Sequence, residues 1–187
     1  MKVTELELPG VKIFEPRVFG DNRGFFCELW NEARYAAAGL AERFVQDNLS
    51  RSSHGTLRGL HYQYPTMQGK LVAVLAGSVF DVVVDIRRGS PHFGRWAGIE
   101  LSGENRRQIW VPRGFAHGFV VTSDSADVFY KVDDAYRPAE EYAVAWDDPD
   151  IAIDWPVAAR HLSGKDRAAP RLADIAGLPP YDGTCGS

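Results

Sequence analysis

The sequence predicts an all-β protein, built as a sandwich or a barrel, with very little helix. Short runs rich in Val, Ile, Phe, Tyr and Trp recur from residue 25 onward, and Gly, Asn, Asp, Ser or Pro residues separate them. This spacing is typical of sandwiches and barrels. In chain order, the expected strands cover residues 25–30, 43–50, 70–77, 78–86, 96–101, 107–112, 118–123 and 127–132.

Only one stretch has a good signal for a helix. Asn31 can cap a helix over the following "EARYAAAGL", and Gly39 is placed to end it after about two turns. A further turn is expected at residues 171–175.

Alternation along the strands indicates which way their side chains point. In the run 78–86, Phe80 and Val82 share one face, whereas Asp81 and Asp85 share the other. Polar side chains on other strands also align, such as Gln46 with Asn48. We therefore expect polar groups from several strands to converge in a barrel that is open at one end and holds one small ligand.

Length and composition limit the class of protein. The chain has 187 residues and a formal net charge of −4, which suits one domain without a basic surface for nucleic acid or an anionic membrane. Cys27 and Cys185 make a poor disulfide framework, and neither a signal peptide nor a membrane span is evident. We expect a single cytoplasmic domain over residues 1–187, with a flexible tail from about residue 177.

The segment "RGLHYQYPTMQGK" draws attention to His61. Strict alternation sends Arg58 to the face opposite His61, but Gly59 between them can form a bulge. A bulge would bring both side chains to the same mouth of the barrel.

The residues of this region suit some kinds of chemistry better than others. His61 and His117, in "VPRGFAHGFV", could form a metal site, but Gln63 stands where a second imidazole would be needed and no carboxylate follows closely. A metal is therefore the minority interpretation, and a simple structural role for His117 remains open. The sequence has no nucleophile elbow and no phosphate-binding glycine loop.

Proton transfer is the chemistry that remains. A histidine is a suitable base near neutral pH, a lysine can stabilise an oxyanion, and a tyrosine can act as an acid. His61, Lys70 and Tyr130 together would suit deprotonation next to a carbonyl, although each residue type is more often structural.

The sequence also resembles a known family. Ordered motifs over residues 15–170 are similar to those of the dTDP-4-dehydrorhamnose 3,5-epimerases, a branch of the cupin superfamily. They are "EPRVFGDNRGFFCELWN", "FVQDNLSRS", "LRGLHYQ", "QGKLVAVLAGSVFDVVVDIR", "SPHFGRWAGIELS", "NRRQIWVPRGFAHGFVV", "FYKVDDAYRPAEE" and "LSGKDRAAP".

This resemblance implies a cupin jelly-roll barrel with short flanking helices that acts as a homodimer and needs no metal or other cofactor. The implied reaction inverts C3 and C5 of dTDP-4-dehydro-6-deoxy-D-glucose. The implied catalytic residues are His61 as the base, Asp166 as its carboxylate partner, Tyr130 as the acid and Lys70 as the stabiliser of the enolate oxygen. The resemblance further implies substrate contacts, some from the partner subunit, by Phe19 or Phe25, Arg23, Glu28, Gln46, Asn48, Arg58, His117, Tyr136, Glu141 and Lys165.

Three alternatives remain open at this stage. A relative from an antibiotic deoxysugar pathway would invert C3 or C5 alone. From other classes, a metal-dependent cupin oxygenase would use His61 and His117, and a non-catalytic protein would only bind a nucleotide sugar.

Overall fold

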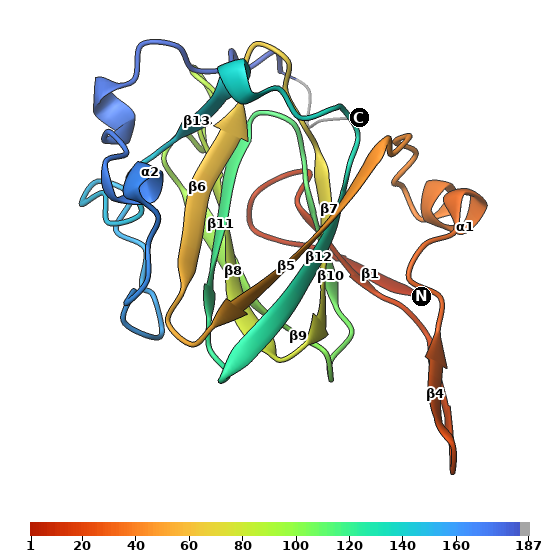
Figure 1. Ribbon diagram of the computed structural model, residues 1–187. Coiled ribbons are helices and arrows are strands. Elements are labelled where there is room, and N and C mark those ends of the chain that lie inside the picture. The colour runs from red at the N-terminus through yellow and green to blue at the C-terminus, as the bar shows by residue number, and fades with distance from the viewer. Residues whose placement is uncertain (184–187) are drawn as a thin grey trace.

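The computed structural model describes residues 1–183, which form two facing antiparallel β-sheets and a separate hairpin (Figure 1). The six-stranded sheet has the order β1-β2-β10-β7-β12-β5, and the five-stranded sheet has the order β13-β6-β11-β8-β9. The strands are β1 (Lys2–Glu5), β2 (Lys12–Glu15), β3 (Val18–Asp21), β4 (Gly24–Cys27), β5 (Gln46–Ser53), β6 (Leu57–Gln63), β7 (Lys70–Ala76), β8 (Ser78–Asp85), β9 (Trp96–Ser102), β10 (Gln108–Val111), β11 (Phe115–Val121), β12 (Ser125–Val132) and β13 (Glu141–Ala143). The helical elements are α1 (Glu32–Ala37), α2 (Gly164–Arg167) and the 3₁₀ turns η1 (Pro138–Glu140) and η2 (Leu172–Asp174).

This architecture confirms the predicted jelly roll with short flanking helices. The prediction was weakest at the chain start, where it missed β1, β2 and β3. Strands β1 and β3 are short and exposed along their whole length, so they show no apolar alternation. The run expected at 25–30 forms strand only as far as Cys27, because the chain then leads into α1.

Helix α1 begins and ends where the sequence predicts. The side chain of Asn31 accepts a hydrogen bond from the backbone N–H of Arg34 at 3.1 Å, as an N-cap residue does. Gly39 follows with a φ of +86°, a conformation that glycine adopts at little cost. The helix buries Tyr35 against the outer face of the six-stranded sheet, where the ring packs on Phe14.

The main core lies between the two sheets. Val74 of β7 and Val128 of β12 pack there against Val83 of β8 and Phe119 of β11. The alternation predicted for β8 is confirmed, because Val82 belongs instead to a second core on the other side of the five-stranded sheet.

The carboxyl-terminal part of the chain covers that second core (Figure 1, blue). Its last described segment is bound rather than loose, which corrects the flexible tail expected from residue 177. Leu178 is buried, and Arg88 joins the segment in a short bridge by donating its N–H to Pro179 and accepting one from Tyr181. The remainder of that tail, residues 184–187 with Cys185, lies outside the described residues. Within residues 1–183, no helix is long and apolar enough to cross a membrane.

Candidate active site

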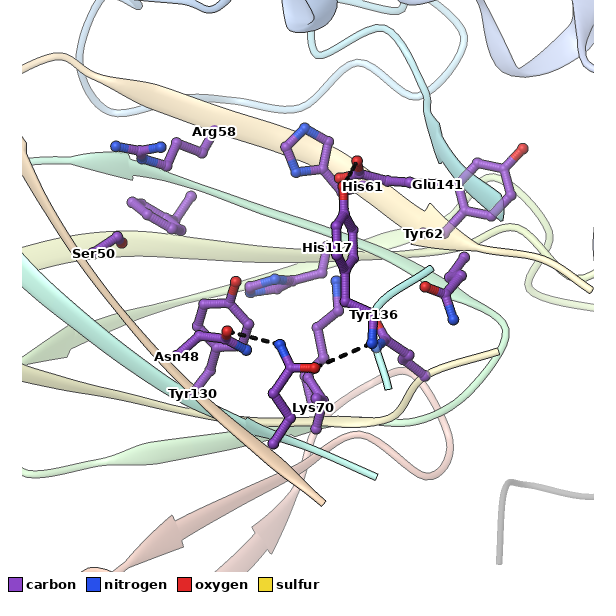
Figure 2. A pocket seen from close by; sticks show the side chains of 15 residues that line it. Asn48, Ser50, Arg58, His61, Tyr62, Lys70, His117, Tyr130, Tyr136 and Glu141 are labelled. Atoms are coloured by element: carbon purple, nitrogen blue, oxygen red, sulfur yellow. Dashed lines mark hydrogen bonds between the residues drawn. The ribbon is translucent and has the colours of Figure 1, made fainter. Parts of the chain in front are cut away.

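A cavity of about 370 Å³ lies between the two sheets, within the size range of small-molecule sites. Figure 2 shows its lining side chains converging from both sheets. The lining residues are Gln46, Asn48, Ser50, Arg58, His61, Tyr62, Gln63, Gln68, Lys70, His117, Phe119, Tyr130, Val132, Tyr136 and Glu141. The expected convergence of polar groups from several strands is therefore confirmed.

A bulge in β6 brings Arg58 and His61 to the same cavity. His61 pairs with His117 of β11, but Arg58 pairs with Phe119, so the register shifts between them. At the shift Gly59 has a φ of +134°, and a Cβ there would lie 2.5 Å from the Cα of Gly118. Only glycine fits this close backbone approach. The structure thus confirms the predicted bulge and its consequence.

His61 is held by a buried carboxylate. Its Nε2 lies 2.5 Å from Oδ1 of Asp166, in the short helix α2. The Oγ of Ser163 caps this helix by accepting the N–H of Asp166, which fixes the carboxylate in place. Burial is the largest single influence on the pKa of Asp166 and raises it, but the hydrogen bond and charge of His61, the hydrogen bond from Ser163 and the charge of Lys165 together lower the pKa overall. Because an ionised carboxylate only accepts, His61 donates through Nε2, and Nδ1 is the ring nitrogen left to accept a proton.

Lys70 and Tyr130 stand on the opposite sheet. They belong to the neighbouring strands β7 and β12, and Figure 2 shows both side chains across the cavity from His61. Burial lowers the pKa of Lys70 to about 8, against the opposing charges of Glu141 and Asp81. Burial also raises the pKa of Tyr130, and Glu141 adds to this, so the phenol keeps its proton at neutral pH.

His117 has a carboxylate partner that the sequence alone does not reveal. Asp81 of β8 is fully buried, and its two oxygens lie 3.0 and 2.9 Å from Nε2 of His117. The strand alternation had already placed Asp81 on the charged face of its strand. The missing information was that β8 and β11 are neighbours, which places this carboxylate beneath the imidazole.

Hydrogen bonds and one ion pair connect five more of the predicted binding residues, all of which except Lys165 line the cavity. Glu141 accepts from the Tyr136 hydroxyl at 2.6 Å and forms an ion pair with Lys165 at 2.5 Å. Burial tends to raise the pKa of Glu141, but these two partners lower it overall. Gln46 donates to Asn48 at 2.9 Å and accepts the backbone N–H of Tyr136 at 3.1 Å. The structure thus brings these five predicted binding residues together.

Four other predicted binding residues lie elsewhere. Phe19, Arg23 and Phe25 belong to the β3–β4 hairpin, which projects away from the barrel in Figure 1. None of the three lines the cavity between the sheets. Arg23 forms an ion pair with Asp21 at 2.5 Å, and Glu28 pairs with Arg34 at 2.9 Å just beyond the hairpin.

Both cavity histidines are bonded through Nε2 to carboxylates. In the part of the chain that the structure describes, no group of three or more His, Cys, Asp or Glu side chains is arranged to hold a metal ion.

Comparison with known proteins identifies the family of this chain. The sequence model of the family described as dTDP-4-dehydrorhamnose 3,5-epimerase matches residues 5–174. The chain belongs to the dTDP-4-dehydrorhamnose 3,5-epimerase family. A curated 3,5-epimerase from Pseudomonas aeruginosa is 54% identical over 181 residues, which are 96% of this chain and 100% of that protein.

Solved structures of the 3,5-epimerase family have the same fold. A dTDP-6-deoxy-D-glucose-3,5-epimerase from Legionella pneumophila, solved in complex with dTDP-4-keto-L-rhamnose, superposes with a TM-score of 0.94 at 53% identity. The match covers 97% of this chain and 98% of the Legionella chain. A 3′-monoepimerase from Streptomyces bikiniensis, solved with dTDP-quinovose, is 34% identical with a TM-score of 0.89, over 94% of this chain and 92% of its own.

Proposed function

We propose that this member of the epimerase family inverts C3 and C5 of dTDP-4-dehydro-6-deoxy-D-glucose to give dTDP-4-dehydro-L-rhamnose. One observation carries the proposal: a histidine with a carboxylate partner faces a tyrosine and a lysine across a cavity. Membership of the 3,5-epimerase family and the high identity to curated 3,5-epimerases support the same reaction.

The chemistry of the sugar explains why one set of residues serves two carbons. C3 and C5 both lie next to the C4 ketone, so loss of either proton gives an enolate whose charge rests on the same oxygen. In the proposed mechanism, the ammonium of Lys70 stabilises that oxygen in both steps. A buried cation is effective there because little water screens it.

Inversion requires that a proton leave one face and return on the other. In the proposed mechanism, Nδ1 of His61 removes the proton, and Asp166 stabilises the imidazolium that forms. Tyr130 then donates its phenolic proton from the opposite sheet. His61 must lose a proton and Tyr130 must regain one before the next inversion, so hydrogen from the solvent enters the sugar.

We propose that the substrate is gripped by two subunits of a homodimer. Within one chain, Arg58, His117, Gln46, Asn48 and the network of Tyr136, Glu141 and Lys165 surround the sugar and its diphosphate. Arginine suits a diphosphate because its fork can bind oxygens in pairs. The β3–β4 hairpin and the residue that follows it, with Phe19, Phe25, Arg23 and Glu28, reach the cavity of a second subunit. Phe19 or Phe25 stacks there on thymine together with Tyr136.

The proposed reaction transfers only protons, so we expect it to need neither a metal nor another cofactor. We also infer that the protein works in the cytoplasm, since Cys27 is a free thiol in the structure. Inversion at a single carbon is the second candidate, and the likeness to a 3′-monoepimerase with the same fold favours it.

Incubation of the protein with dTDP-4-dehydro-6-deoxy-D-glucose in deuterated water tests the proposal. We expect deuterium at both C3 and C5, detected by NMR and mass spectrometry. Label at only one carbon would establish the single-site reaction instead. If neither carbon is labelled although the sugar binds, the protein is a binding module. Stoichiometric iron in the purified protein, with activity lost to a chelator, would favour an oxygenase.

A further inference from the structure

The loop of residues 134–137 carries Tyr136 to the mouth of the cavity. The side chain of Tyr136 is 48% exposed and yet lines the cavity, and its hydroxyl donates to Glu141. Ala135 and Arg137 beside it are exposed as well, so no side chain of this loop is buried in a core. Hydrogen bonds must therefore hold the loop in place.

Gln63, at the end of β6, makes the most hydrogen bonds to this loop. Its Oε1 accepts the backbone N–H of Arg137 at 2.8 Å, and its Nε2 donates to the carbonyls of Thr66 at 2.7 Å and Ala135 at 3.4 Å. Gln63 is only 5% exposed, which makes a lost bond costly because the partner groups would remain unpaired. Both N–H donors of its amide are used, and its oxygen already accepts one hydrogen bond from the loop.

Two more glutamines bind the same loop from other segments. Gln68, just before β7, donates through Nε2 to the carbonyl of Asp134 at 2.6 Å. Gln46 of β5 accepts the backbone N–H of Tyr136 at 3.1 Å. Residues 134–137 are thus held through their backbone on each side of Tyr136.

In the proposed reaction, the position of Tyr136 affects which carbon of the sugar faces His61. One base and one acid serve two carbons on either side of the ketone, so the sugar must present C3 and C5 to His61 in turn. The walls of the cavity decide which carbon is presented. Tyr136, which in the proposed complex also stacks on the thymine and so anchors the nucleotide beside the sugar, lies on a hydrogen-bonded loop, whereas His61, Lys70 and Tyr130 lie on strands.

We propose that Gln63, assisted by Gln68, is a positioning residue that sets the depth of Tyr136 in the cavity and thereby the balance between proton exchange at C3 and at C5. This inference rests on the proposed function.

The test compares deuterium incorporation at C3 and C5 in deuterated water for the wild type and for Gln63→Met. Methionine keeps the volume but loses all three hydrogen bonds. We expect the ratio of the two exchange rates to change about fivefold, the factor that corresponds to one typical hydrogen bond. Gln68→Met, at a less buried site, should shift the ratio in the same direction.

Gln108→Met is the matched control. Gln108 is 2% exposed and is bonded to the Tyr35 hydroxyl and the carbonyl of Leu29, beneath α1 and away from the cavity. Its loss should lower stability and total activity without changing the ratio, since a smaller folded fraction slows both exchanges equally.

The outcomes separate the inference from the function on which it rests. If the wild type exchanges both carbons and both cavity variants keep the wild-type ratio, the inference is wrong and the function stands. A wild type that exchanges one carbon or none overturns both. If Gln63→Met does not fold, Gln68→Met alone decides.

Discussion

The cavity and the β3–β4 hairpin differ in how far their side chains are buried. In the cavity region, three carboxylates are each paired within the same chain: Asp166 with His61, Asp81 with His117, and Glu141 with Lys165. Such pairing is what burial of charge requires. In the hairpin, three phenylalanines stand in solvent, with Phe26 66% exposed and Phe25 57% exposed.

This difference indicates which part of the proposed active site forms within a single chain. Groups that must hold a defined protonation state are assembled inside the barrel before any substrate arrives. The hairpin instead presents an exposed apolar surface, of the kind that marks an interaction site. The proposed dimer explains both regions, because the hairpin would be covered by a second subunit and its substrate.

Among the changes considered, replacement of His61 in the cavity should lower solvent exchange the most. For His61→Ala we expect solvent exchange to fall about 10²- to 10⁴-fold, the usual contribution of a general base, while dTDP still binds. Exchange is measured by NMR in deuterated water and dTDP binding by calorimetry. His54→Ala is the control, because His54 bonds to the carbonyl of Ser123 outside the cavity. Exchange within tenfold of the wild type in His61→Ala would show that another residue is the base.

Mixing two impaired variants tests whether the hairpin of one subunit completes the active site of the other. Arg23→Ala should lower kcat/KM about 10- to 100-fold, as expected for lost charge-assisted hydrogen bonds. When Arg23→Ala and His61→Ala subunits exchange, a mixed dimer contains one intact site. In an equal mixture about half of the dimers are mixed, and one of their two sites is intact. Product formation should therefore recover to about a quarter of the wild-type rate.

A second mixture provides the control for this experiment. His61 and Tyr130 face the same cavity of one chain, so His61→Ala mixed with Tyr130→Phe should recover no activity. Equal recovery in both mixtures, or none in the first, would contradict a hairpin shared between subunits.

The pH dependence of turnover should report on Lys70. Its ammonium exists below its pKa of about 8, so kcat should fall as the pH rises through about 8. An arginine stays charged at any accessible pH, and Lys70→Arg should move this decline upward by about one pH unit or more. Steady-state rates from pH 6 to 10 measure the effect. A wild-type profile that is flat to pH 10 would show that the charge of Lys70 is not required.

The smallest expected effect is a gain in stability at the cost of function. The pKa of Lys70 is about 8 in the folded protein and 10.5 for a lysine in the unfolded chain, so the unfolded chain binds the proton more tightly. At neutral pH the charged lysine therefore opposes folding. Lys70→Met should raise the free energy of unfolding by about 1–3 kcal/mol while activity is lost, measured by thermal and urea unfolding. The gain should shrink as the pH rises from 8 toward 10.5.

Lys131→Met is the matched control for stability. Lys131 follows Tyr130 but points to the outer face of the sheet, where it pairs with Asp47 at 2.6 Å. We expect its replacement to leave stability unchanged or slightly lower. A Lys70→Met variant no more stable than Lys131→Met would mean that the Lys70 ammonium is well solvated.

Much of the barrel could be predicted because its signals are local. Alternation placed Asp81 and Val82 on opposite faces of β8, and a cap residue and a glycine marked the two ends of α1. The glycine in "RGLH" also marked the bulge that aligns Arg58 with His61. These features depend on residues only a few positions apart, so a pattern in the chain suffices to find them.

Contacts between residues that are far apart in the sequence could not be predicted from such local patterns. His61 and Asp166 are 105 residues apart, and no periodicity links them. The family resemblance implied that pair, but neither it nor the strand pattern assigned Asp81 to His117 or the three glutamines to the loop of Tyr136. The prediction of a flexible tail was wrong for residues 177–183 for a related reason, since the Pro and Gly content of this segment does not indicate the surface on which it packs.

The order of residues alone thus establishes strands, their buried faces and the kinds of side chain available for proton transfer, because these follow from backbone geometry and local spacing. The folded arrangement decides which nitrogen of His61 is free, why the pKa of Lys70 falls and why that of Tyr130 rises. Those properties depend on burial and on neighbours from other strands, and both exist only once the two sheets have closed around the cavity.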